Sequence, residues 1–245
     1  MQVKVRGYLK AATIAAVLAL VAAGSAVFGM NSAATAGSAY QLVKKFKESV
    51  TGRKAEPSAQ HIARESLFSL SVEHHKVVFL GDSHTERAEW AEFFPASDTA
   101  NRGIGGDTTA LIDARMESAL LPAPEKVFLM AGVNDIVNAG LGDEDVFPQY
   151  EGIVRKARSA GAKVYVQSTL YVGKAVARFE RHNTEIAELN QRLKALCGTG
   201  ACQFIDLNAS LAPDGFLPEE STADGVHLLG PAYLIWADRI RGLVS

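Results

Sequence analysis

A serine, an aspartate and a histidine in this chain stand in settings that suit nucleophilic catalysis. Ser83 lies in Gly-Asp-Ser, directly after an apolar run and at the expected start of a helix. There it projects from a tight turn, with its backbone N–H near the positive end of the helix. Asp224 and His227 are three positions apart, so the carboxylate can hold the imidazole while its other nitrogen faces a nucleophile. These residue types are compatible with nucleophilic catalysis by a serine.

Two further segments offer hydrogen-bond donors rather than a nucleophile. Gly105 and Gly106 precede Asp107, and such glycines let the backbone approach a ligand and present its N–H groups. The segment lacks the Lys-Ser/Thr ending of a phosphate loop. Asn134 follows another apolar run. Taken singly, each feature has a structural alternative, because Ser83 also suits a helix cap and Asn134 an ordinary turn.

The elements that must position these residues alternate along the chain. Short apolar runs rich in β-branched residues predict strands, and longer segments between them predict helices. The predicted strands are 76–80, 99–104, 126–130, 163–168 and 203–207. The predicted helices are 58–71, 85–94, 108–120, 144–159, 177–196 and one after Pro231. Single helices between strands favour right-handed crossovers, so the fold class is α/β, a three-layer α/β/α sandwich around a parallel sheet.

This architecture by itself predicts that the candidate residues lie close together. In open parallel sheets, ligands bind at the carboxyl ends of the strands. The segments with Ser83, Gly106 and Asn134 each follow a predicted strand, and Asp224 and His227 precede the last helix. We therefore expect one site at this edge of the sheet.

Together the four segments resemble the SGNH, or GDSL-like, hydrolase family. The stretch Asn-Arg-Gly-Ile-Gly-Gly-Asp-Thr-Thr is similar to its compact branch of platelet-activating-factor acetylhydrolase-like esterases. The resemblance covers residues 76–245 and implies a flavodoxin-like fold with a five-stranded parallel sheet. It implies that Ser83 is the nucleophile, with Asp224 and His227 completing a triad. The implied oxyanion hole consists of the backbone N–H groups of Ser83 and Gly106 and the side chain of Asn134.

One position departs from the family pattern. His84 stands where the family's nickname has leucine, and we expect it to shape the pocket rim rather than to act as a base. Several aromatic and apolar side chains are candidates either for the pocket lining or for ordinary core packing. These are Trp90, Phe93, Phe94, Tyr171, Phe216 and Leu217.

The resemblance also indicates a substrate class. It implies hydrolysis of short acyl esters, chiefly acetyl, on small molecules, envelope glycans or lipids, with no cofactor and no metal. Two alternatives stay open. The same triad serves a glycan O-acyltransferase, in which a sugar hydroxyl replaces water, and the domain could instead be a non-catalytic envelope-binding module.

The N-terminal region predicts export. Lys4, Arg6 and Lys10 precede the uncharged apolar run 11–30, which is long enough to cross a bilayer as a helix. We read residues 1–30 as a signal peptide or signal-anchor, 31–57 as a linker and 58–245 as the hydrolase domain. The domain is thus expected outside the cytoplasm, either anchored and facing the periplasm or the extracellular side, or secreted after cleavage.

The charge distribution bears on nucleic-acid binding, and the two cysteines bear on disulfide formation and zinc binding. The formal net charge is −2 and no basic stripe follows the first ten positions, which argues against nucleic-acid binding. Cys197 and Cys202 flank a Gly-containing turn, and both a disulfide and two free thiols stay open. They lack the spacing of a zinc site. The oligomeric state is not predicted.

Overall fold

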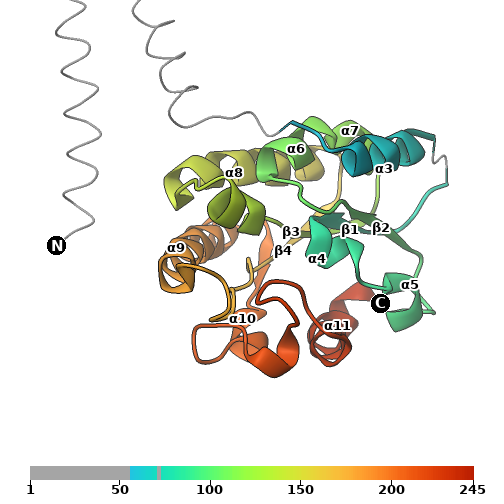
Figure 1. Ribbon diagram of the computed structural model, residues 1–245. Coiled ribbons are helices and arrows are strands. Elements are labelled where there is room, and N and C mark those ends of the chain that lie inside the picture. Colours follow the sequence, from blue (N-terminus) through green and yellow to red (C-terminus); the bar gives the residue numbers. More distant parts are fainter. Residues whose placement is uncertain (1–55, 71–72) are drawn as a thin grey trace, which may run out of the picture. The chain divides into compact units, whose positions relative to one another are not determined.

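The computed structural model describes residues 56–70 and 73–245, and its centre is a five-stranded, all-parallel sheet (Figure 1). The strand order is β2-β1-β3-β4-β5. The strands are β1 (Val77–Gly81), β2 (Thr99–Gly103), β3 (Lys126–Met130), β4 (Lys163–Gln167) and β5 (Gln203–Ile205). This order is the flavodoxin-like one. The α/β prediction, with five parallel strands in the predicted places, is therefore confirmed.

Helices cover both faces of the sheet, which is why its three central strands, β1, β3 and β4, are mostly apolar. Along β1, Val78 and Leu80 belong to one buried cluster, whereas Val77 and Phe79 belong to the other. The first cluster takes side chains from α6 (Thr109–Ala114), α7 (Met116–Ala119), α8 (Asp143–Ser159) and α9 (Phe179–Gly198). The second takes them from α5 (Trp90–Phe93), α10 (Asn208–Leu211) and α11 (Gly230–Val244). Figure 1 shows these layers on opposite sides of the strands.

Several aromatic side chains considered for a pocket belong to the second cluster instead. The ring of Trp90 stacks on that of Phe79, with centroids 3.9 Å apart. Phe94 and Leu217 are buried in the same cluster. Of the two interpretations, core packing holds for these residues.

Two predicted helices are each divided in the structure. The segment 85–94 forms α4 (Ser83–Glu86) and then α5. Asn101 ends α4, because its Nδ2 lies 3.0 to 3.1 Å from the carbonyls of Thr85, Glu86 and Ala88. The segment 108–120 is interrupted at Arg115, the residue between α6 and α7. The side chain of Arg115 is buried.

The N-terminal helix of the described chain is α3 (Ala59–Leu70), which contacts α7 as expected of a helix on the domain edge. Cys197 and Cys202 form a disulfide between α9 and β5. None of the helices within 56–70 and 73–245 has the length and apolarity to cross a membrane. The predicted segment 11–30 and most of the predicted linker 31–57 lie outside the described residues.

Candidate active site

The structure brings Ser83, His227 and Asp224 into one hydrogen-bonded line. The Nε2 of His227 lies 3.0 Å from the Oγ of Ser83, although 144 positions separate the two residues. The Nδ1 of the same ring lies 2.6 Å from Oδ2 of Asp224. Ser83 is the first residue of α4, just beyond β1, whereas Asp224 and His227 lie in the loop before α11. The fold therefore brings the segment after the first strand together with the loop before the last helix, as expected from the sequence.

Asp224 fixes both the ring and the backbone of the histidine loop. Its Oδ1 accepts from the backbone N–H groups of Val226 (2.9 Å) and His227 (2.8 Å). Partial burial opposes ionisation, but these hydrogen bonds and the one from the His227 ring together hold the pKa of Asp224 well below its usual range. The residue is therefore a carboxylate at neutral pH, which places the shared proton on Nδ1 and leaves Nε2 free to accept.

The turn that carries Ser83 is built by its neighbours. A Cβ on Gly81 would lie 2.2 Å from Oγ1 of Thr85 and 2.3 Å from the carbonyl of Met130, so only glycine allows the strand to turn so closely. Asp82 caps α4 by accepting the backbone N–H of His84 (3.0 Å). This leaves the backbone N–H of Ser83 without an acceptor in the described part of the chain.

Gly106 presents a second backbone donor at the end of the loop after β2. Its φ of +82° lies in the left-handed region that favours glycine. The neighbouring Gly105 donates to the carboxylate of Glu86 (2.8 Å), which holds the loop against α4. Within residues 56–70 and 73–245, nothing accepts the N–H of Gly106. Both N–H groups that the resemblance assigns to an oxyanion hole are thus unoccupied by protein acceptors.

Asn134 begins a short π-helix, η1 (Asn134–Asn138), immediately beyond β3. Its Nδ2 donates to the backbone carbonyl of Asp107 (2.9 Å), and its Oδ1 accepts from Nδ2 of Asn138 (2.8 Å). These contacts fix the orientation of the amide, and its second N–H is left for a ligand because an amide nitrogen carries two donors. A π-turn is common at functional sites but leaves no mark in the sequence.

A model of the GDSL-like lipase/acylhydrolase family matches residues 79–233, more than half of the chain, and this span includes all five candidate residues. The chain belongs to the GDSL-like lipase/acylhydrolase family. The family expectation drawn from the sequence is therefore confirmed, together with the fold that it implied.

Relatives and solved structures agree with this membership. Platelet-activating factor acetylhydrolase IB subunit alpha2 of Gallus gallus is 30% identical over 167 residues, which cover 64% of this chain and 70% of the relative. N-acylneuraminate cytidylyltransferase of Streptococcus agalactiae is 25% identical over 173 residues, 68% of this chain but only 40% of that protein. A solved Streptococcus pneumoniae protein, named as a platelet activating factor, is 25% identical with a TM-score of 0.69, and the match covers 85% of this chain and 99% of that one.

His84, where the family's nickname has leucine, does not lie on a pocket rim as expected. Its side chain is 2% exposed, and its two ring nitrogens face Asp82 and the backbone carbonyl of Val226. The expectation was wrong because it treated the position as an outward-facing one on α4. The burial of His84 arises from α11 as well, where the hydroxyl of Tyr233 donates to its carbonyl (2.9 Å).

A buried polar cluster of Asp107, Arg115 and His61, not predicted from the sequence, lies beside the glycine loop, residues 103–106, of this acylhydrolase. The carboxylate of Asp107 is buried and accepts from Nε of Arg115 (2.7 Å), and it contacts Nδ1 of His61 in α3 (2.6 Å). Arg115 also donates to the carbonyl of Gly81 (3.0 Å). The guanidinium therefore joins the loop that carries Gly106 to the turn that precedes Ser83. His61 is 46 positions from Asp107, so no local pattern marks the contact.

A second buried carboxylate, that of Asp135, holds the first residue of α6 by hydrogen bonds. Asp135 accepts from both the backbone N–H (3.0 Å) and Oγ1 (2.6 Å) of Thr109. Burial raises the pKa of Asp135 to about 6, and the hydrogen bonds from Thr109 limit this rise. Asp135 directly follows Asn134, so this contact fixes η1 against the start of α6.

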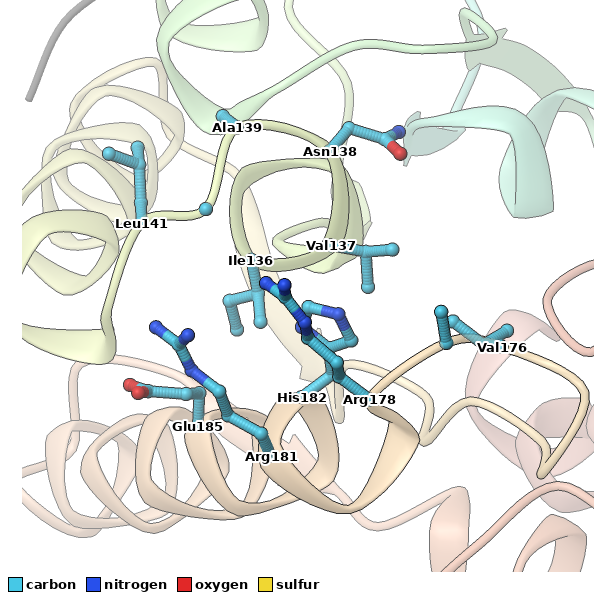
Figure 2. Close-up of a pocket in the computed structure, with 12 residues that line it drawn as sticks. Ile136, Val137, Asn138, Ala139, Leu141, Val176, Arg178, Arg181, His182 and Glu185 are labelled. Atoms are coloured by element: carbon cyan, nitrogen blue, oxygen red, sulfur yellow. The ribbon is translucent and has the colours of Figure 1, made fainter.

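A cleft of about 470 Å³ with both apolar and charged residues in its lining lies beside η1 (Figure 2). One wall is η1, where Asn138 lines the cleft and also holds Asn134. The other wall includes Val176, which packs against Gly225 in the loop that carries His227. The two residues are so close that a Cβ added to Gly225 would lie 2.9 Å from Cγ2 of Val176. The cleft is thus lined by the η1 segment and by one residue that packs against the His227 loop, and none of the five candidate catalytic residues lines it.

The cleft carries side chains of both charges. Arg178 and Arg181 line it from the start of α9, and neither guanidinium makes an ion pair within the described residues. Arg178 adopts a φ of 61°, unusual for a residue with a side chain. Glu185, one helical turn after Arg181 on α9, also lines the cleft and lies close to the carboxylates of Asp143 and Glu188. Figure 2 shows Arg178 and His182 below η1, with Glu185 farther along α9.

Proposed function

We propose that the chain is a serine esterase that hydrolyses short acyl esters, chiefly acetyl esters. The observation that carries this proposal is the contact of 3.0 Å between Oγ of Ser83 and Nε2 of His227, whose Nδ1 is held by Asp224. This is the arrangement in which an imidazole removes the proton of a serine while a carboxylate fixes its tautomer. Membership of an acylhydrolase family supports the same reaction class.

The proposed reaction has two halves. In the first, Oγ of Ser83 attacks the ester carbonyl carbon as Nε2 of His227 takes its proton, and the C=O electron pair moves onto oxygen. His227 then gives that proton to the departing alcohol, and an acyl-Ser83 ester remains. In the second half, His227 takes a proton from water, the hydroxide attacks the acyl carbon, and Ser83 recovers its proton as the acid leaves.

The oxyanion formed in each half would lie among three donors. These are the backbone N–H groups of Ser83 and Gly106, which have no acceptor among the residues that the structure describes, and the second N–H of the Asn134 amide. Donors already fixed by the fold stabilise the developing charge without reorganisation, and one of them is typically worth roughly 3–4 kcal/mol of barrier. The Asn134 amide is fixed by the Asp107 carbonyl and by Asn138.

The substrate that these features favour is an acetylated sugar. One relative is named an acetylhydrolase and another acts, by its name, on N-acylneuraminate, an acylated sugar acid. The lining of the cleft beside η1 combines apolar residues, such as Ile136 and Leu141, with the polar and charged side chains of Asn138, Arg178 and His182. These polar side chains offer hydrogen-bond partners to the hydroxyl groups of a sugar. We propose that the sugar lies in this cleft while its ester reaches Ser83.

We also propose that the enzyme works outside the cytoplasm on envelope glycans. The support is the basic flank at Lys4, Arg6 and Lys10 with the apolar run 11–30. In this arrangement the segment is either retained as a membrane anchor or removed.

The purified protein, incubated with aryl esters of increasing acyl length and with O-acetylated glycans, tests the proposed reaction. We expect the highest kcat/KM for acetyl and a steep fall with longer acyl chains. Product analysis with an added glycan acceptor distinguishes an O-acyltransferase, which would transfer the acetyl group to the sugar instead of releasing acetate. Absence of turnover on every ester, from folded protein, would favour the binding module.

A further inference from the structure

We propose that protonated His84 is a positioning residue that ties the turn carrying Ser83 to the loop carrying His227, and so sets an upper pH limit on activity. The effect on activity rests on the proposed function. The tie itself is a property of the folded chain.

The tie consists of two hydrogen bonds made by one buried ring. Nε2 of His84 lies 2.8 Å from the carbonyl of Val226, and Nδ1 lies 3.2 Å from Oδ1 of Asp82. A backbone carbonyl only accepts, so Nε2 must carry a proton. A carboxylate also only accepts, so Nδ1 must carry one as well. The geometry therefore describes an imidazolium paired with the carboxylate of Asp82.

The electrostatic surroundings favour this charged form. Burial alone would lower the pKa of His84, but the hydrogen bond and charge of Asp82 and the Val226 carbonyl together raise it above the usual histidine value, against a smaller opposing effect of Arg87. The ring of His227 lies 5.8 Å away, centroid to centroid, with Asp224 behind it. From α11, the hydroxyl of Tyr233 faces the His84 carbonyl.

The position of Val226 explains why the tie matters for the proposed chemistry. Val226 directly precedes His227 and shares with it the Oδ1 of Asp224. Next to Val226, the carbonyl of Gly225 accepts from the N–H of Gly173 (2.7 Å). His84, the residue that follows Ser83, holds the loop at Val226 itself. Its contact with Val226 thus supports the 3.0 Å separation between Ser83 and His227.

The sign of the pH effect follows from the raised pKa. The imidazolium is fully present below the ordinary histidine value and is lost as pH rises through the higher value in the folded protein. Once one proton leaves, a nitrogen lone pair faces an oxygen, and the tie to Val226 or to Asp82 opens. Small displacements of a reacting pair are costly, so kcat should fall while KM changes little.

Kinetics with the full chain test the proposal, using an aryl acetate over a range of pH. We compare wild type with His84→Leu, which has neither donor, and His84→Gln, which keeps an amide donor for Val226 but does not titrate. We expect His84→Leu to lower kcat roughly ten- to a hundredfold with little change in KM. His84→Gln should recover most of this loss, and neither variant should show the alkaline decline of wild type.

A matched control is His75→Leu. His75 also contacts an aspartate, Asp98 (2.8 Å), but it is partly exposed and lies before β1. This variant should keep the wild-type profile. An unchanged kcat in folded His84→Leu, or an alkaline decline that persists in both His84 variants, would overturn the proposal. Thermal melts confirm that each variant is folded.

Nitrogen NMR of histidine-labelled protein separates this proposal from the proposed esterase. We expect both His84 nitrogens to carry protons at neutral pH, because the pKa of His84 is raised above the ordinary histidine value. A singly protonated His84 at neutral pH would overturn the tie even in an active esterase. If instead wild type hydrolysed no ester while His84 were doubly protonated, the proposed function would fail and the structural tie would stand.

Discussion

Asn134 donates its side-chain amide to the backbone carbonyl of Asp107 at 2.9 Å, which joins the segment after β3 to the glycine loop after β2. Two of the three proposed oxyanion donors, Gly106 and Asn134, are thereby fixed relative to each other. The carboxylate of the same Asp107 is held from behind by Arg115 and His61. The donors thus rest on a buried polar core rather than on a loose loop.

Replacing Asn134 by alanine should separate stabilisation of the transition state from formation of the nucleophile. Ser83 and His227 stay in place, so a fluorophosphonate should still label the protein. Turnover of an aryl acetate should fall roughly a hundred- to thousandfold with a much smaller change in KM, because an oxyanion donor acts on charge that develops in the transition state. Wild-type kcat in a folded Asn134→Ala variant would remove this residue from the oxyanion hole.

Replacing Arg115 by leucine should destabilise the fold strongly. The change leaves the buried carboxylate of Asp107 without its guanidinium, and loss of one partner of a buried pair costs about 3–5 kcal/mol of unfolding free energy. Lys156→Leu is the matched control, since its pair with Asp113 is partly exposed and is worth about 1 kcal/mol or less. Urea unfolding measures both. Equal effects of the two substitutions would contradict the central role of the Asp107 pair.

The cleft beside η1 predicts a charge preference. Arg178→Gly removes a guanidinium while suiting the left-handed backbone at this position, so the fold should be retained. We expect KM for an acetylated sugar that bears a carboxylate to rise roughly two- to fivefold, less so at high salt. Arg178→Gly should not change the KM for an aryl acetate. The control is Arg239→Ala, a change to an exposed arginine on α11, which should not change the KM for either substrate. Equal losses on both substrates would argue against the cleft as the sugar site.

The proposed location has a direct test. A reporter that is active only after export, fused beyond Ser245, should be active when the basic flank and the apolar run 11–30 precede the domain. Deleting residues 1–30 should abolish the reporter signal. Recovery of the intact fusion from the cytosol, with an inactive reporter, would contradict export.

The fold was predictable because its signals are local. Apolar runs such as 126–130 mark strands buried on both faces, and the amphipathic segments between them become α8 and α9 within a few residues of the predicted bounds. That the candidate residues lie near one another was predictable, because Ser83, Gly106 and Asn134 come shortly after strands and the remaining two precede the last helix. Asp224 and His227 come from a loop, but their spacing of three residues is itself a signal.

The features that the sequence did not reveal depend on distant partners. Nothing near His61 indicates that it contacts Asp107, and nothing near His84 indicates that Val226 accepts from its ring. The division of the 85–94 segment has the same origin, since it is Asn101 on β2 that binds the carbonyls at the end of α4. Such contacts exist only once the sheet has placed its strand ends side by side.

The nucleophile is the centre of this account, and Ser83→Ala tests it most directly. The change removes only the Oγ that lies 3.0 Å from His227 and leaves the rest of the site in place. Measured together on freshly purified protein, turnover of an aryl acetate and the mass added by a fluorophosphonate should both be present in wild type and absent in the variant. If folded Ser83→Ala protein still hydrolysed the ester at a rate close to that of wild type, Ser83 would not be the nucleophile and the proposed mechanism would be wrong.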